Sequence, residues 1–190
     1  MESGLSIIAT STAIVALAEI GDKTMLLAML LAARFRQPVQ VIAGICVATL
    51  ANHALAAWAG AALADWLAGP WFQIAVGAGF LAMAAWVLVP DRMDEAPAAS
   101  GQQAFVATVL AFFLVEIGDK TQVATIALGA RFQDVTAVAI GTTLGMMLVN
   151  VPAVLVGERA LGWVPLGWVR AGAALLFGAL GAALLWAALR

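Results

Sequence analysis

The stretch AEIGDKTMLLAMLLAARF occupies positions 18–35, and VEIGDKTQVATIALGARF occupies positions 115–132. At a constant offset of 97 residues and without a gap, Glu19–Phe35 and Glu116–Phe132 are identical at ten of seventeen positions. The identities include every letter of EIGDKT, so the chain contains an internal duplication. Both copies place Glu, Asp and Lys inside apolar sequence, and the solvent around those charges decides what they can do.

The composition indicates an all-α integral membrane protein whose solvent is the lipid bilayer. The chain is 64% hydrophobic and 11% charged, with a mean hydropathy of +1.03, whereas soluble domains carry about 25% charged residues. A net charge of −2 is too small to indicate a nucleic-acid partner. The single cysteine, Cys46, excludes a disulfide within the chain and a multi-cysteine metal site. The N-terminal MESG lacks the basic region of a cleavable signal peptide, so we expect the first helix to direct insertion.

Six apolar segments of membrane-spanning length can be read along the chain. They cover residues 5–33, 39–63, 71–89, 104–130, 135–156 and 169–189. The sequence PDRMDEAPAASGQQ has the composition of a solvated loop and separates the third segment from the fourth. We therefore expect a first three-helix repeat at 1–90, a cytoplasmic loop at 91–103 and a second three-helix repeat at 104–190. Because three is odd, the second repeat should enter the membrane in the opposite direction, as in the inverted-topology repeats of secondary transporters.

Arginine counts predict the orientation of these segments in a cell (inner) membrane. Loops on one face carry five arginines, and the opposite face carries two. Because basic residues favour the cytoplasmic side, the richer loops should be cytoplasmic and both termini should lie outside. The richer face has Arg34, Arg36, Arg92, Arg159 and Arg170, and the poorer face has Arg131 and Arg190.

The charges of the two motifs must be compensated within the membrane. Six ionised groups would cost roughly 15–20 kcal/mol if they were unpaired in lipid. A purely structural network is one solution, because Lys23 and Lys120 each follow a glutamate by four residues. Those pairs would still leave a surplus of −1 in each motif. Two motifs brought together would carry −2, which one divalent cation neutralises. The acidic residues are Glu19, Asp22, Glu116 and Asp119.

The residue types favour a hard divalent cation. Carboxylate oxygens suit Ca²⁺, Mn²⁺ or Mg²⁺, and Thr24, Thr121 and Gln122 could add neutral oxygens. Gly21 and Gly118 allow close packing or local unwinding within the motifs. The first segment has 29 residues and would be about 43 Å long as one helix, so it should be tilted or broken in a ~30 Å hydrocarbon core.

The same carboxylates predict coupling to protons. Four of them crowded in a low dielectric cannot all stay ionised without a cation, so protons should replace a departing metal. Asn52 and Asn150 lie at matching depths and either line the pathway or form interhelical hydrogen bonds. His53 is a candidate proton relay or a packing residue. Gly141 and Gly145 indicate close helix packing.

The two EIGDKT segments resemble the signature Glu-x-Gly-Asp-(Lys/Arg)-(Thr/Ser) of a family of cation/proton exchangers. That family includes the Golgi manganese and calcium transporters of eukaryotes and bacterial manganese exporters. The layout of six helices, with motifs on the first and fourth and a central loop, is similar throughout. The resemblance implies a transporter, not an enzyme, with no cofactor, which exchanges Mn²⁺ and/or Ca²⁺ for protons and exports Mn²⁺ from the cytoplasm. It carries the cation site over to Glu19, Asp22, Glu116 and Asp119.

Met25 departs from the pattern of that family, whose members commonly have Gln after the Thr in both motifs. If Met25 points at the ion, its thioether should disfavour Ca²⁺ more than Mn²⁺. Otherwise it fills space against a neighbouring helix.

Other functions fit parts of the sequence. A passive divalent-cation channel shares every feature except proton coupling. An intramembrane aspartyl protease also places paired acids in helices, but a symmetric set of four acids suits a divalent ion better than an asymmetric acid/base pair. A basic-amino-acid exporter would need a group that recognises an α-carboxylate, and none is evident. The oligomeric state stays open, with a homo-oligomer among the alternatives.

Overall fold

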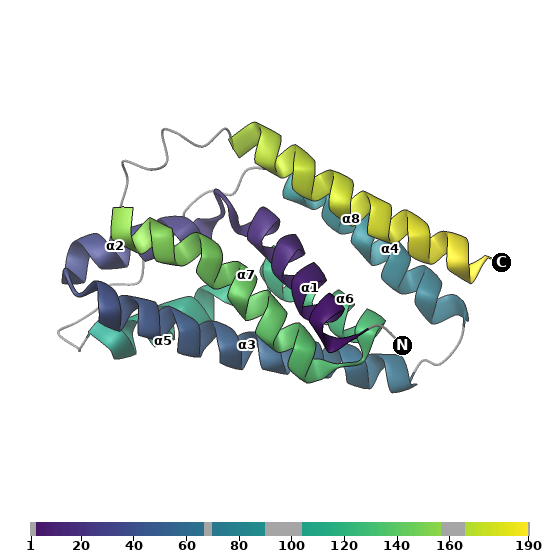
Figure 1. Ribbon diagram of the computed structural model, residues 1–190, viewed down its shortest axis with the longest axis horizontal. Coiled ribbons are helices and arrows are strands. Elements are labelled where there is room, and N and C mark those ends of the chain that lie inside the picture. The colour runs from purple at the N-terminus through teal and green to yellow at the C-terminus, as the bar shows by residue number, and fades with distance from the viewer. Residues whose placement is uncertain (1–2, 67–69, 90–103, 157–165, 190) are drawn as a thin grey trace.

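The computed structural model describes residues 3–66, 70–89, 104–156 and 166–189, and these ranges contain helices and no strand. Figure 1 shows α4 and α8 side by side along one edge of the helical assembly. The eight helices in these ranges are α1 (Gly4–Glu19), α2 (Lys23–Phe35), α3 (Pro38–Trp66), α4 (Pro70–Val87), α5 (Ala104–Glu116), α6 (Lys120–Phe132), α7 (Val135–Val156) and α8 (Leu166–Ala188).

The first and fourth predicted segments are each broken into two helices at the EIGDKT motif. Gly21 and Gly118 have φ values of 80° and 76°, in the left-handed region that glycine adopts without a steric penalty. Asp22 and Asp119 follow in an extended conformation and occupy the N-cap positions of α2 and α6. The chain therefore changes direction inside the motif, and α1 and α2 are bent by 74° relative to each other. Of the two solutions expected for an overlong segment, the break is the one observed.

The internal duplication extends to backbone conformation and packing. Helices α2 and α6 both end in a left-handed residue, Arg36 and Gln133 respectively. Helix α1 packs on α7 as α5 packs on α3. Phe80 and Phe177, which are also 97 residues apart, stack on each other with ring centroids 6.0 Å apart. The loop predicted at 91–103 lies outside the described residues, and the repeat boundaries stay predictions.

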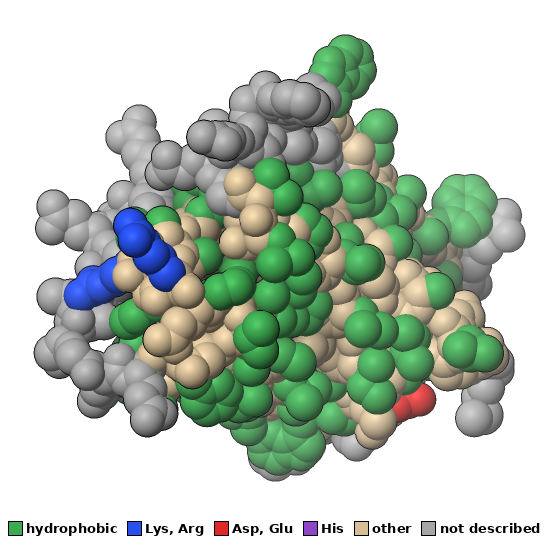
Figure 2. Space-filling model, turned by 60° about the vertical axis from the view of Figure 1, so that its left-hand side comes forward, with side chains coloured by type: hydrophobic (Ala, Val, Ile, Leu, Met, Phe, Trp, Pro, Cys, Tyr) green, Lys and Arg blue, Asp and Glu red, His purple; other side chains and the backbone are tan. Residues whose placement is uncertain are grey.

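The surface and the long helices are those of a membrane protein. Within the described ranges, Pro38–Ala64 and Val135–Val156 are long and apolar enough to cross a bilayer, and α1 with α2 gives a third span if the bent pair counts as one. The apolar parts of α4, α5 and α8 are shorter, so six spans stay a prediction. Large side chains such as Leu55 and Leu148 are more than half exposed. Figure 2 shows hydrophobic side chains spread over one face, with Lys and Arg gathered at one side.

Glycines bring the helices into backbone contact, and the close packing expected at Gly141 and Gly145 is confirmed. A Cβ atom at Gly141 would lie 2.7 Å from the carbonyl oxygen of Ile8 on α1. A Cβ at Gly145 would lie 2.6 Å from the carbonyl oxygen of Thr12. These two glycines therefore set the distance between α7 and α1, the helix that ends at Glu19.

Gly145→Ala should lower the thermal stability of the purified protein, because the added methyl group forces α1 and α7 apart. Overpacking of this kind costs about 1–3 kcal/mol. The matched control is Gly79→Ala, at a helical glycine where, among the described residues outside its own stretch of helix, no atom lies within 4 Å of the added Cβ. Thermal unfolding in detergent should show a lower midpoint for Gly145→Ala alone. Equal midpoints for the two variants would contradict the close packing.

Candidate functional site

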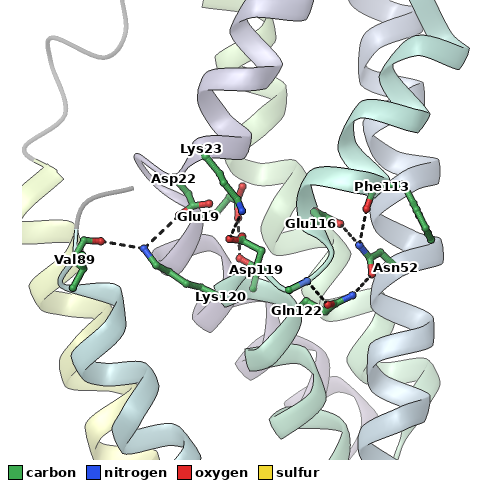
Figure 3. Close-up of polar contacts among 12 residues, drawn as sticks. Glu19, Asp22, Lys23, Asn52, Val89, Phe113, Glu116, Asp119, Lys120 and Gln122 are labelled. Atoms are coloured by element: carbon green, nitrogen blue, oxygen red, sulfur yellow. Dashed lines mark hydrogen bonds and ion pairs between the residues drawn. The ribbon is translucent and has the colours of Figure 1, made fainter. Parts of the chain in front are cut away.

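The two motifs meet inside the helical assembly although they are 97 residues apart. Each glutamate is the last residue of a helix, and each lysine is the first residue of the next. The four carboxylates are buried, with at most 4% of any of these residues exposed. Figure 3 shows side chains of both motifs in one polar cluster between the helix ends. The break at each motif therefore places charged side chains at helix ends that face each other.

The ion pairs run between the motifs. Lys23 Nζ lies 2.9 Å from Asp119 Oδ1, and Lys120 Nζ lies 3.9 Å from Asp22 Oδ1. Lys120 also donates a hydrogen bond to the carbonyl oxygen of Val89 at 3.0 Å. The sequence favoured pairs within each motif, between residues four apart. That spacing brings side chains together only on a continuous helix, and both helices break at the glycine.

Each glutamate accepts a hydrogen bond from an asparagine on another helix. Asn52 Nδ2 donates to Glu116 Oε2 at 3.2 Å, and Asn150 Nδ2 donates to Glu19 Oε1 at 3.4 Å. The structure therefore shows the interhelical hydrogen bond, one of the two roles that the sequence left open for these asparagines. The two asparagines fix the orientation of the two buried carboxylates.

Two threonines complete the contacts to the glutamates. Thr121 Oγ1 donates to Glu19 Oε2 at 3.1 Å, which joins the second motif directly to the first. Thr49 Oγ1 lies 3.4 Å from Glu116 Oε1. Sequence reasoning missed Thr49. Its signal was its spacing of three residues from Asn52, which puts both side chains on one face of α3.

Met25 and Gln122 occupy equivalent positions with different surroundings. Gln122 Oε1 accepts from the backbone N–H of Gly118 at 2.7 Å, and its Nε2 donates to Asn52 Oδ1 at 2.5 Å. Met25 is buried in an apolar cluster with Met29 and Ala153. These surroundings agree with the packing role for Met25 that the sequence left open.

Several buried polar atoms lack a hydrogen-bond partner within the described part of the chain. Thr24 Oγ1, Asn150 Oδ1 and Asp119 Oδ2 are among them. Both ring nitrogens of His53, which follows Asn52 in α3, also lack a hydrogen-bond partner among the described residues. Buried polar atoms normally pair, so each of these needs an explanation.

The charge of the cluster and the spacing of its carboxylates bear on metal binding. Four carboxylates and two ammonium groups give a formal charge of −2 when all are ionised. Across the residues that the structure describes, no group of three or more His, Cys, Asp and Glu side chains is close enough to hold a metal ion. The aspartates form ion pairs with the lysines, and the glutamates accept hydrogen bonds from the asparagine amides. The net charge of the cluster is the one that a divalent cation would neutralise, and its two aspartates are paired with lysine ammonium groups.

Comparison with known proteins finds a matching family model and a similar relative. The family model described as "Divalent cation/proton antiporter GDT1" matches residues 7–95 and 104–190. A relative from Vibrio cholerae serotype O1 is 51% identical over 177 residues, which cover 93% of this chain and 88% of the relative, and it bears the name "Putative manganese exporter". No solved structure matches the chain significantly. Both motifs fall within the matched ranges, which cover all of the second predicted half and residues 7–90 of the first.

Proposed function

The chain belongs to the divalent cation/proton antiporter family GDT1, and on that basis we propose that it exports Mn²⁺ from the cytoplasm in exchange for protons. The observation that carries the proposal is the meeting of the two motifs through the crossed lysine–aspartate pairs. The name of the Vibrio relative supports Mn²⁺ as the cargo.

The charge of the site supports a divalent cargo. One Mn²⁺ neutralises the surplus of −2, and carboxylate, hydroxyl and amide oxygens are the ligands that such a hard cation prefers. Met25 stands where a second glutamine would supply one more amide oxygen. Ca²⁺ takes six to eight oxygens, so a site with fewer neutral oxygens favours Mn²⁺ over Ca²⁺.

The lysines and protons provide the coupling. When Mn²⁺ enters, the ammonium groups of Lys23 and Lys120 move off the aspartates that they contact. When Mn²⁺ leaves, the lysines return and protons neutralise the remaining carboxylates, because uncompensated charge in a low dielectric is costly. Metal and protons thus alternate on the same oxygens, which is the requirement for exchange.

The halves act as inverted-topology repeats with six spans and both termini outside the cytoplasm. Support comes from the equal backbone breaks, the reciprocal lysine–aspartate pairs and the stacking of Phe80 on Phe177. Equivalent residues of two repeats contact each other where a two-fold axis passes between them. In such repeats the cation site lies near the midplane, at the interface between the halves.

Transport in proteoliposomes tests the proposed function. The full chain is reconstituted, a pH gradient is imposed, and uptake of Mn²⁺, Ca²⁺ and Mg²⁺ is measured. A pH gradient should drive Mn²⁺ accumulation above equilibrium, and a Mn²⁺ gradient should drive protons in the opposite direction. Mn²⁺ movement that leaves the internal pH unchanged would identify a passive channel instead.

Gln37 and Gln133, both exposed at equivalent turns of the two halves, should face opposite sides of the membrane. In a Cys46→Ser background, Gln37→Cys should react with an impermeant maleimide only from the cytoplasmic side. Gln133→Cys should react only from outside, because the second half is inverted. Labelling of intact cells and inverted vesicles reads both out, and labelling of both cysteines from one side would contradict inverted repeats.

A further inference from the structure

The two asparagines that donate to the glutamates differ in what their amide oxygens contact. Both donate Nδ2 to a glutamate, but only Asn52 Oδ1 accepts a hydrogen bond, from Gln122 Nε2. Asn150 Oδ1 is fully buried and has no hydrogen-bond partner in the described ranges. The two halves of the site are therefore not equivalent.

The orientation of the Asn150 amide is determined by its other contacts. Its Nδ2 donates to Glu19 Oε1 at 3.4 Å and to the carbonyl oxygen of Met146 at 3.1 Å. Turning the amide over would place its oxygen against two acceptors, which is unfavourable. The atom without a partner is thus an oxygen, the atom type that a hard cation binds.

Met25 accounts for the difference between the halves. In the second half, Gln122 spans from the backbone N–H of Gly118 to Asn52 Oδ1. In the first half the equivalent side chain is a thioether, which cannot donate a hydrogen bond. Met25 packs with Ala153 on α7, within one turn of Asn150. A glutamine at position 25 could donate a hydrogen bond to Asn150 Oδ1. Met25 cannot, so this oxygen stays without a donor.

Thr24 repeats this asymmetry. Its counterpart Thr121 donates to Glu19, whereas Thr24 Oγ1 is fully buried and has no partner among the described residues. Thr24 lies in the first turn of α2, beside Met25, and α2 packs against α7. Two buried neutral oxygens, Thr24 Oγ1 on α2 and Asn150 Oδ1 on α7, thus have no partner among the described residues, and α2 and α7 contact each other.

We propose that the transported cation binds off-centre, on the Glu19 half of the site, with Asn150 Oδ1 and Thr24 Oγ1 as neutral ligands. Met25 determines this position by leaving Asn150 Oδ1 open, and it acts without ligating the ion. Gln122 keeps Asn52 Oδ1 occupied, so Asn52 orients Glu116 and does not bind the cation. The inference rests on the proposed function and names ligands within the same site.

The test measures Mn²⁺ affinity in the purified full chain with Met25→Gln, and with Asp134→Asn as the control. Met25→Gln should supply a donor to Asn150 Oδ1 and weaken Mn²⁺ binding about tenfold, which corresponds to about 1.4 kcal/mol. It should also raise the unfolding temperature without Mn²⁺, because a buried oxygen gains a partner. Asp134→Asn, at the start of α7 and outside the cluster, should leave the Mn²⁺ affinity within about threefold of wild type.

Thr24→Val gives a second measurement that does not depend on a new hydrogen bond. It removes a hydroxyl without a partner, so the fold should be unaffected while Mn²⁺ affinity falls about tenfold. Wild-type affinity in both Met25→Gln and Thr24→Val would overturn the off-centre site and leave Mn²⁺ exchange intact. A wild-type protein that binds no Mn²⁺ would instead overturn the proposed function, and the ligand assignment with it.

Discussion

Glu19→Gln should abolish Mn²⁺/H⁺ exchange, with transport reduced at least about 100-fold while the protein stays folded. The substitution changes the formal charge of the cluster from −2 to −1, so a divalent cation is no longer neutralised. Two unit charges 4 Å apart interact by about 4 kcal/mol at an effective dielectric of 20. A 100-fold loss needs about 2.7 kcal/mol, so losing this one charge is sufficient.

The fold should survive because glutamine has the shape of glutamate: its amide oxygen can accept from Asn150 Nδ2, and its NH₂ group can donate to the hydroxyl of Thr121, which also accepts. The control is Asp134→Asn, because Asp134 accepts a hydrogen bond from the backbone N–H of Ala137 at the start of α7. It should transport at the wild-type rate. Proteoliposome uptake at matched protein density compares the two, and a wild-type rate for Glu19→Gln would remove Glu19 from the site.

Lys120→Met should reduce transport at least about tenfold without weakening Mn²⁺ binding. Lys120 is buried and contacts Asp22 and the carbonyl oxygen of Val89. Without its ammonium group, Mn²⁺ has less competition on entry, but Asp22 loses its counter-charge once Mn²⁺ has left. An extra proton must then bind in each cycle, so transport should also depend more steeply on pH.

The separation of binding from transport distinguishes this variant from Glu19→Gln, which should lose both. Lys120→Arg, which keeps the positive charge, is the control and should retain most of the activity. Equilibrium Mn²⁺ binding and initial transport rates are measured on the same preparations. Weaker Mn²⁺ binding by Lys120→Met would show that this lysine supports the cation instead of competing with it.

The duplication made much of the arrangement predictable from the sequence. Two identical charged motifs in apolar sequence had to meet, because isolated charges are too costly in lipid, and they do meet. The length of the first segment and Gly21 together indicated a break or a tilt, and the break lies at that glycine. The approximate positions of the helices were predictable because arginines, prolines and loops limit the apolar runs.

The partners within the cluster could not be predicted in the same way. Pairing of residues four apart assumes a continuous helix, so the crossed pair of Lys23 with Asp119 was not foreseen. Thr49 is separated from Glu116 by 67 residues, and only the packing of α3 on α5 brings them together. The open oxygen of Asn150 likewise depends on which side chain of α2 faces α7.

Counting protons while purified protein is titrated with Mn²⁺ tests most directly whether metal and protons compete for one carboxylate cluster. We expect one Mn²⁺ to bind per chain, with release of at least one proton into a weakly buffered solution. The number released should fall as the pH is raised, because fewer carboxylates then carry a proton. Glu19→Gln should lose both the binding and the release. Stoichiometric Mn²⁺ binding with no proton release at any pH would contradict exchange through this cluster.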